Sequence, residues 1–103
     1  MAVRVRDGET FSGTKELIAK ACFTALRECR FTVIESNDVQ GWIRARAPMS
    51  FRSFGENIIV TVHMSGKIEI VSESRFFTQT FDWGKNRANV NKLLSKLRSA
   101  LRP

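Results

Sequence analysis

Apolar residues recur at every third or fourth position in two long segments of the chain, residues 13–29 and 83–101. This spacing places them on one side of an α-helix, with charged residues on the other side. The apolar stripe of the first segment consists of Leu17, Ile18, Ala21, Cys22, Ala25, Leu26 and Cys29. The stripe of the second consists of Val90, Leu93, Leu94, Leu97 and Leu101. The pattern predicts two helices, the first capped by Ser12 or Thr14 and the second by Asp82.

One aromatic residue departs from the pattern of the first helix. Phe23 projects roughly opposite the apolar stripe, because side chains on a helix repeat about every 3.6 residues. A large apolar side chain is not expected on a side that faces solvent. We therefore expect a partner, or the chain's own loops, to cover Phe23.

Short runs of β-branched and aromatic residues between the two helical segments are typical of strands. The strands are expected over residues 31–36, 41–47, 57–64 and 68–74, with a further short strand over residues 2–6. Asp7-Gly8 is a dipeptide typical of turns and should end this first strand. Asn37-Asp38 should likewise end the strand at residues 31–36. Pro48 should end the strand at residues 41–47, because proline has no N–H to donate to a neighbouring strand.

The strands at residues 57–64 and 68–74 form a hairpin whose register follows from its apolar positions. A three-residue loop, Ser65-Gly66-Lys67, would place the strongly apolar partners on one face, with Val62 opposite Ile70. A one-residue slip would mix the two faces, which is costly where one face is buried. The same register places His63 opposite Glu69 on the outer face.

The predicted order of elements is one strand, one helix, four strands and one helix. Hairpin spacing favours an antiparallel sheet of four or five strands, and two one-sided helices should cover one of its faces. The chain is therefore expected to form a single α+β domain in two layers over residues 1–103. This order resembles the TATA-box-binding-protein-like fold and a shortened helix-grip fold, and neither resemblance implies a function.

Length and composition limit the class of protein. A chain of 103 residues with 43% apolar and 26% charged residues is typical of one small globular domain. The N-terminal residues contain no apolar stretch of about 7–15 residues, and no window approaches the roughly 20 apolar residues of a membrane span. We therefore expect a cytoplasmic protein without a membrane partner. Cys22 and Cys29 lie two helical turns apart, roughly 10 Å, so they are expected as reduced, buried thiols.

Charge gives the next indication of a partner. The chain has 17 Lys and Arg against 10 Asp and Glu, a net charge of +7. Strand alternation over residues 41–47 puts Ile43, Ala45 and Ala47 on one face and Trp42, Arg44 and Arg46 on the other. Together with Arg52 and Phe54 in the following loop, these basic and aromatic residues could hold phosphates and stack bases. They are the candidate surface for a protein partner or for weak nucleic-acid binding.

Residues suited to catalysis or to a cofactor are few. His63 is the only histidine, and no serine, threonine or cysteine is tied to it by local spacing. The nucleophile elbow, the phosphate-binding loop and the dinucleotide-binding glycine pattern are absent from the sequence. We therefore predict no catalytic, cofactor-binding or metal-binding residues. The leading hypothesis is a non-enzymatic binding or protein-interaction module, self-association included, and the alternative is nucleic-acid binding through the basic sheet face.

The most distinctive motif connects the last strand to the last helix. It reads Ser72-Glu73-Ser74-Arg75 and then Asp82-Trp83-Gly84-Lys85-Asn86. This pattern is similar to that of small bacterial domains of unknown function, over about residues 41–101, and the resemblance implies no established activity.

We interpret the residues of this motif mainly as structural. Asp82 should cap the helix, Gly84 should allow a close turn, and Asn86 should bond to a neighbouring loop. The alternative is a ligand pocket between the last helix and the sheet, with Arg75 and Asn86 at its rim.

Overall fold

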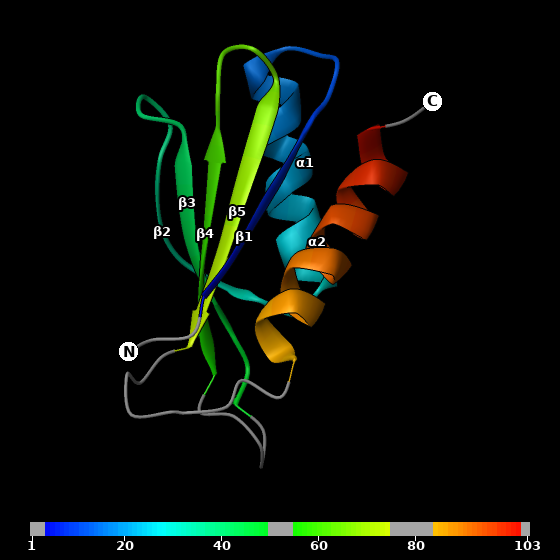
Figure 1. Ribbon diagram of the computed structural model, residues 1–103. Helices are drawn as coiled ribbons and strands as arrows, with labels where there is room; N and C mark the ends of the chain where they lie inside the picture. The colour runs from blue at the N-terminus through cyan, green and yellow to red at the C-terminus, as the bar shows by residue number, and fades with distance from the viewer. Residues whose placement is uncertain (1–3, 50–54, 75–83, 102–103) are drawn as a thin grey trace.

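The computed structural model describes residues 4–49, 55–74 and 84–101. The elements are β1 (Arg4–Thr10), α1 (Lys15–Glu28), β2 (Thr32–Asn37), β3 (Trp42–Ala47), β4 (Glu56–Val62), β5 (Lys67–Ser74) and α2 (Lys85–Leu101). The five strands form one antiparallel sheet in the order β1-β5-β4-β3-β2. Both helices lie on the same side of this sheet (Figure 1). The predicted α+β class is therefore confirmed.

The core lies between the helices and every second residue of the central strands. The buried apolar residues of β3, β4 and β5 are Ile43, Ala45, Ala47, Ile58, Val60, Val62, Ile68 and Ile70. The helices contribute Ile18, Cys22, Ala25, Leu26, Val90, Leu93, Leu94 and Leu97. Both predicted stripes are thus confirmed, with one exception. Leu17 is 54% exposed, because it lies about 100° around α1 from Ile18, on the flank of the stripe.

Each helix begins at a residue that accepts a hydrogen bond from the first turn of the helix. The hydroxyl of Thr14 accepts a hydrogen bond from the backbone N–H of Leu17 at 3.1 Å, so Thr14 caps α1. At the start of α2, the carbonyl of Gly84 accepts the N–H of Ala88 at 2.9 Å, which gives Gly84 the capping position. Asp82, the predicted cap, lies outside the described residues.

Strand β1 corrects the prediction of a turn at Asp7-Gly8. Both residues lie inside the strand, and Gly8 pairs with Glu69 of β5. A Cβ atom on Gly8 would lie 2.7 Å from the carbonyl oxygen of Ile68, so the glycine permits close approach of two backbones. Pairing along the full length of β5 outweighs the local turn tendency of the dipeptide.

The loop between β4 and β5 has three residues, as predicted, but it lies one residue earlier, at Met64-Ser65-Gly66. The N–H of Gly66 donates to the carbonyl of His63 at 3.0 Å, and the N–H of His63 donates to the carbonyl of Lys67 at 2.9 Å. Gly66 has φ +90°, the left-handed conformation that the last residue of such a loop requires. Glycine therefore fixes the loop at a position that apolar matching alone did not reveal.

The shifted loop changes the register of the hairpin by two residues. Val62 lies opposite Ile68 rather than Ile70, and Thr61, not His63, lies opposite Glu69. A shift of two residues keeps every side chain on its predicted face, because strand side chains alternate with period two. His63 still reaches Glu69 diagonally, with Nε2 of the imidazole 2.7 Å from a carboxylate oxygen.

The edge strand β2 is irregular. Its pairing with β3 shifts between Val33 and Glu35, so Ile34 is the extra residue of a β-bulge. Val33 and Ile34 are exposed.

Both cysteines are free and buried on the core side of α1, as predicted. Burial raises the pKa of the Cys22 thiol to about 12, and burial is also the main cause that raises the pKa of Cys29. The reactive thiolate is therefore scarce near neutral pH.

We expect a disulfide reagent at pH 8 to label native protein far more slowly than protein unfolded in guanidinium. The variants Cys22→Ser and Cys29→Ser report on the remaining thiol in each case. Native labelling of either thiol at the rate of the unfolded chain would contradict the assignment of both residues to the core.

Candidate functional site

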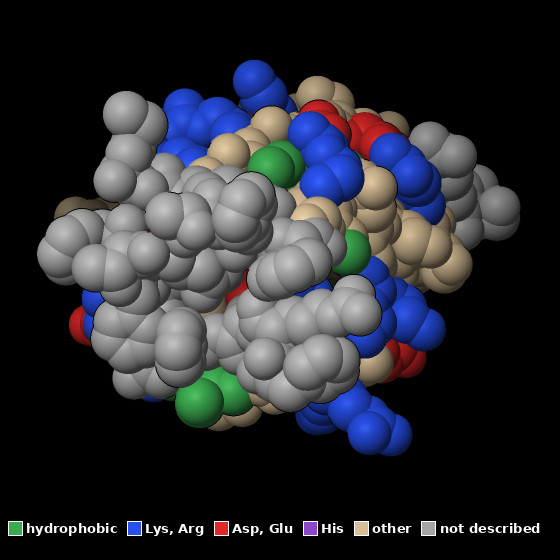
Figure 2. All heavy atoms as spheres, turned by 60° about the horizontal axis from the view of Figure 1, so that its bottom comes forward, with side chains coloured by type: hydrophobic (Ala, Val, Ile, Leu, Met, Phe, Trp, Pro, Cys, Tyr) green, Lys and Arg blue, Asp and Glu red, His purple; other side chains and the backbone are tan. Residues whose placement is uncertain are grey.

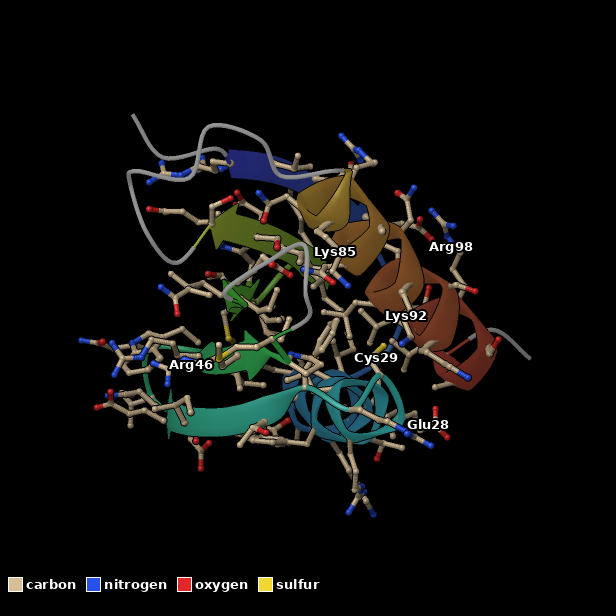
Figure 3. All side chains as sticks on the ribbon, turned by 90° about the horizontal axis from the view of Figure 1, so that it is seen from below. Glu28, Cys29, Arg46, Lys85, Lys92 and Arg98 are labelled. Carbon is tan, nitrogen blue, oxygen red and sulfur yellow. The ribbon has the colours of Figure 1, made fainter. Side chains whose placement is uncertain are left out.

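The open face of the sheet, on the side away from the helices, carries the predicted basic strand residues. Trp42 and Arg46 are half-buried there and Arg44 is exposed. Figure 3 shows Arg46 on the side of the sheet opposite the helices. Arg52 and Phe54, which were expected beside them, lie outside the described residues.

Acidic partners neutralise two of the arginines on this face. A guanidinium nitrogen of Arg44 lies 2.6 Å from a carboxylate oxygen of Glu35 on β2, and Arg4 is paired with Glu73 at 2.8 Å. The register places Ile59, which is 39% exposed, between these two pairs. The open face is thus a mixed surface, with an apolar centre and paired charges, rather than a continuous basic patch.

The positive charge is dispersed on the face of the molecule that Figure 2 shows. Figure 2 shows Lys and Arg side chains at several separate places around one end of the molecule. Dispersed charge of this kind supports solubility and nonspecific attraction more than a defined binding site.

His63 and Glu69 form a pair at the tip of the β4–β5 hairpin. The hydrogen bond to His63 is the main cause that lowers the pKa of Glu69. Among residues 4–49, 55–74 and 84–101, no group of three His, Cys, Asp or Glu side chains could hold a metal ion. No helix in these ranges is long and apolar enough to span a membrane.

A buried polar cluster joins α2 to β4 and β5 at the end of the sheet where the distinctive motif lies. It consists of Glu56, Ser72, Ser74, Asn86 and Asn89. The amide nitrogen of Asn89 donates to the Glu56 carboxylate at 2.6 Å and to the Ser72 hydroxyl at 3.2 Å. The Ser72 hydroxyl donates to the Asn86 amide oxygen at 2.7 Å, and the Asn86 amide nitrogen donates to the Ser74 hydroxyl at 3.1 Å.

This cluster corrects one prediction and adds two residues. Asn86 bonds to Ser72 and Ser74 of strand β5, and it is fully buried rather than placed at a pocket rim. Arg75, the other predicted rim residue, lies outside the described residues. Glu56 and Asn89 were missed, although Asn89 continues the buried stripe of α2 three residues after Asn86. A polar residue on an apolar stripe is the signal that could have identified it.

A groove runs between α1 and the β2–β3 hairpin, with a volume of about 450 Å³. We call it the helix–hairpin groove; it is lined by Lys15, Glu16, Ala19, Lys20, Phe23, Thr24, Arg27, Asn37, Asp38, Gly41, Trp42, Ile43 and Val62. Phe23 is one of the lining residues and is half-buried, which accounts for an aromatic side chain opposite the apolar stripe of α1. Sequence reasoning identified Phe23 as anomalous but could not locate the groove.

A second hollow adjoins the first at Phe23 and Arg27. It is also lined by Arg30, Phe31, Thr32 and Val33 and has a volume of about 420 Å³. We call it the basic hollow, because Arg27 and Arg30 are its charged residues and it has no acidic lining residue. The two hollows together follow α1 from its first turn to its end.

Arg30 has an unusual backbone conformation. Its φ is 63°, and it is the one non-glycine residue with positive φ in the part of the chain described by the structure. Its N–H donates to the carbonyl of Arg27 at 2.9 Å, while the N–H of Phe31 donates to the carbonyl of Leu26 at 2.9 Å. These two bonds form a Schellman motif, in which the residue at the position of Arg30 is usually glycine.

Comparison with known proteins adds no further site residues. No protein-family model matches this chain, and its sequence matches no curated protein.

Proposed function

We propose that this chain is a non-enzymatic binding module and that its ligand occupies the helix–hairpin groove. The observation that carries the proposal is Phe23, a large aromatic side chain half-buried in the wall of a concave surface. Ligand sites are usually clefts of about 300–1,000 Å³ with a largely apolar lining and a few polar groups. The groove, at about 450 Å³, is of this size.

The groove combines apolar contact with charge. Ala19, Phe23, Ile43 and Val62 supply apolar surface from α1, β3 and β4. Lys and Arg side chains of α1 stand along the same groove. This combination suits a ligand that buries an apolar part and keeps a polar part near solvent.

The proposal assigns no catalytic role to the nucleophilic or titratable groups that stand out in the sequence. The thiols of Cys22 and Cys29 are buried and have raised pKa values. His63 is paired with Glu69 and does not line the groove.

Nucleic-acid binding through Trp42, Arg44 and Arg46 is the alternative function. It requires Arg side chains that are free to contact phosphates. Because Arg44 is paired with Glu35, and Arg4 with Glu73, we favour the groove.

The test uses anilinonaphthalene sulfonate, a fluorescent probe with an apolar ring system and one negative charge. We expect the native protein to bind the probe and Phe23→Ser to weaken binding at least about tenfold, since burying a Phe side chain contributes about 1.5–3 kcal/mol. The matched control is Leu17→Ser, which removes an exposed apolar side chain from the same helix and should change the affinity less than twofold. Thermal unfolding of each variant checks that the fold is retained.

Two outcomes would overturn the proposal. One is an equal loss of affinity in the Phe23 and Leu17 variants, or no probe binding at all. The other is binding of a mixed-sequence single-stranded oligonucleotide that Arg44→Ala/Arg46→Ala abolishes and Phe23→Ser leaves unchanged, which would establish the alternative.

A further inference from the structure

We infer that the ligand of the helix–hairpin groove is an amphipathic organic anion: one carboxylate on an unbranched apolar chain. The chain lies against Phe23, and the carboxylate lies between Arg27 and Arg30. The inference rests on the proposed function and adds the chemical class of the ligand and its orientation.

The charges along the groove are unequal at its two ends. Glu16 and Asp38 line one end, near the start of α1, where Lys15 and Lys20 balance their charge. Arg27 lines the other end, about eleven residues and therefore about 16 Å further along the helix than Glu16, and Arg30 lines the adjoining basic hollow. An anionic group is consequently attracted to the second end, because the basic hollow there has no acidic lining residue.

The arginines at the second end are available to a ligand. Both are exposed, and no ion pair involves either of them in the ranges that the structure describes. The carbonyls of Leu26 and Arg27 already accept the Schellman hydrogen bonds, which reduces the negative character of this helix end. Arg side chains bind carboxylates with two parallel hydrogen bonds, so a pair of them is well suited to one carboxylate.

The backbone of Arg30 is a second, independent observation. Glycine would occupy its left-handed conformation without a steric penalty, whereas arginine does so at a cost. Non-glycine residues in such conformations are found more often at ligand and active sites than elsewhere, held there by the surrounding structure. Arg30 is also a lining residue of the basic hollow, so the left-handed position carries a guanidinium group beside a concave surface.

The middle of the groove accounts for the apolar part of the ligand. Between the two charged ends, α1 presents Ala19, Phe23 and Thr24, and Ile43 of β3 lines the opposite wall. A flexible alkyl chain can follow this surface from the arginines toward the start of α1. Each methylene group in contact should strengthen binding about fourfold, from about 0.8 kcal/mol per buried CH₂.

The experiment compares three ligands that share a ten-carbon chain, by isothermal titration calorimetry below their micelle concentrations. They are decanoate, 1-decanol and decyltrimethylammonium. We expect decanoate to bind at least about tenfold more tightly than 1-decanol, because hydrogen bonds to charged groups contribute about 1.5–3 kcal/mol. The cation should bind most weakly, and octanoate should bind about fifteenfold more weakly than decanoate.

Variants then test the orientation. Arg30→Gly should reduce decanoate affinity about tenfold and leave 1-decanol unchanged, while the midpoint of thermal unfolding stays at or above that of the parent protein. This combination separates loss of the guanidinium from loss of the fold. Arg27→Gln should reduce the affinity for decanoate by a similar factor. Lys67→Gln, which removes an exposed charge outside both hollows, should change this affinity less than twofold.

The results distinguish failure of the ligand class from failure of the site. Equal affinities for the three ligands, or an unchanged decanoate affinity in Arg30→Gly, would contradict the inference that the ligand is an anion. The groove would still stand as a binding site. Binding of a Glu- and Leu-rich helical peptide without binding of decanoate would replace the small molecule with an acidic protein segment. No binding of any ligand, together with no binding of the fluorescent probe, would overturn the proposed function itself.

Discussion

Leu97→Ala is expected to lower the free energy of unfolding by about 2–5 kcal/mol, as measured by urea denaturation. Leu97 is completely buried on the face of α2 that packs against the sheet and α1. Truncation to alanine removes apolar contacts and leaves a cavity that a rigid β-sheet fills only in part. The slope of free energy against urea concentration should stay unchanged, because the surface exposed on unfolding is nearly the same.

Leu101→Ala is the control for this experiment. It is the same substitution one turn later, at a residue that is only half-buried at the end of the helix. It should lower the free energy of unfolding by less than about 1 kcal/mol, since residues at a frayed helix end make few contacts. Equal costs for the two variants would contradict the packing of α2 described above.

Asn89→Ala is expected to lower the free energy of unfolding by about 1–3 kcal/mol, although it removes little apolar surface. The amide of Asn89 is the donor that contacts both the Glu56 carboxylate and the Ser72 hydroxyl. Without it, two buried acceptors lose a hydrogen-bond donor in a place that water does not readily reach. The measurement is again urea denaturation at neutral pH.

Asn91→Ala provides a matched control for the polar cluster. Asn91 is exposed on the same helix, and its replacement should change stability by less than about 0.5 kcal/mol, or increase it slightly through helix propensity. A cost for Asn89→Ala as small as that of the control would show that the cluster does not hold α2 on the sheet.

Much of the fold follows from periodicity in the sequence. Apolar spacing predicted both helices, and strand alternation predicted which residues of β3 face the core. The errors arose where a distant segment decides the local structure. Asp7-Gly8 is a turn by local preference but a strand because β5 is available for pairing, and Leu17 is exposed because it lies on the flank of the apolar stripe of α1.

The candidate sites were harder to predict, because they depend on the relative placement of elements. Alternation placed Trp42 and Arg44 on the open face, but the ion pair of Arg44 with Glu35 depends on the bulged pairing of β2 with β3. The groove depends on the distance between α1 and the β2–β3 hairpin, which no local pattern encodes. The similarity of the segment from Ser72 to Asn86 to bacterial domains of unknown function stays a prediction, and its serines and asparagine join α2 to the sheet.

The bulge in β2 also affects how this protein behaves when it is concentrated. An open sheet ends in two edge strands, and a regular apolar edge can pair with the same edge of another molecule and start aggregation. Val33 and Ile34 make β2 the vulnerable edge, and the extra residue there breaks the row of hydrogen-bonding groups that an incoming strand would need. The opposite edge, β1, alternates charged residues such as Arg4 and Arg6 instead. Each edge therefore carries its own barrier to sheet extension, and the exposed apolar residues of β2 stay accessible without recruiting further strands.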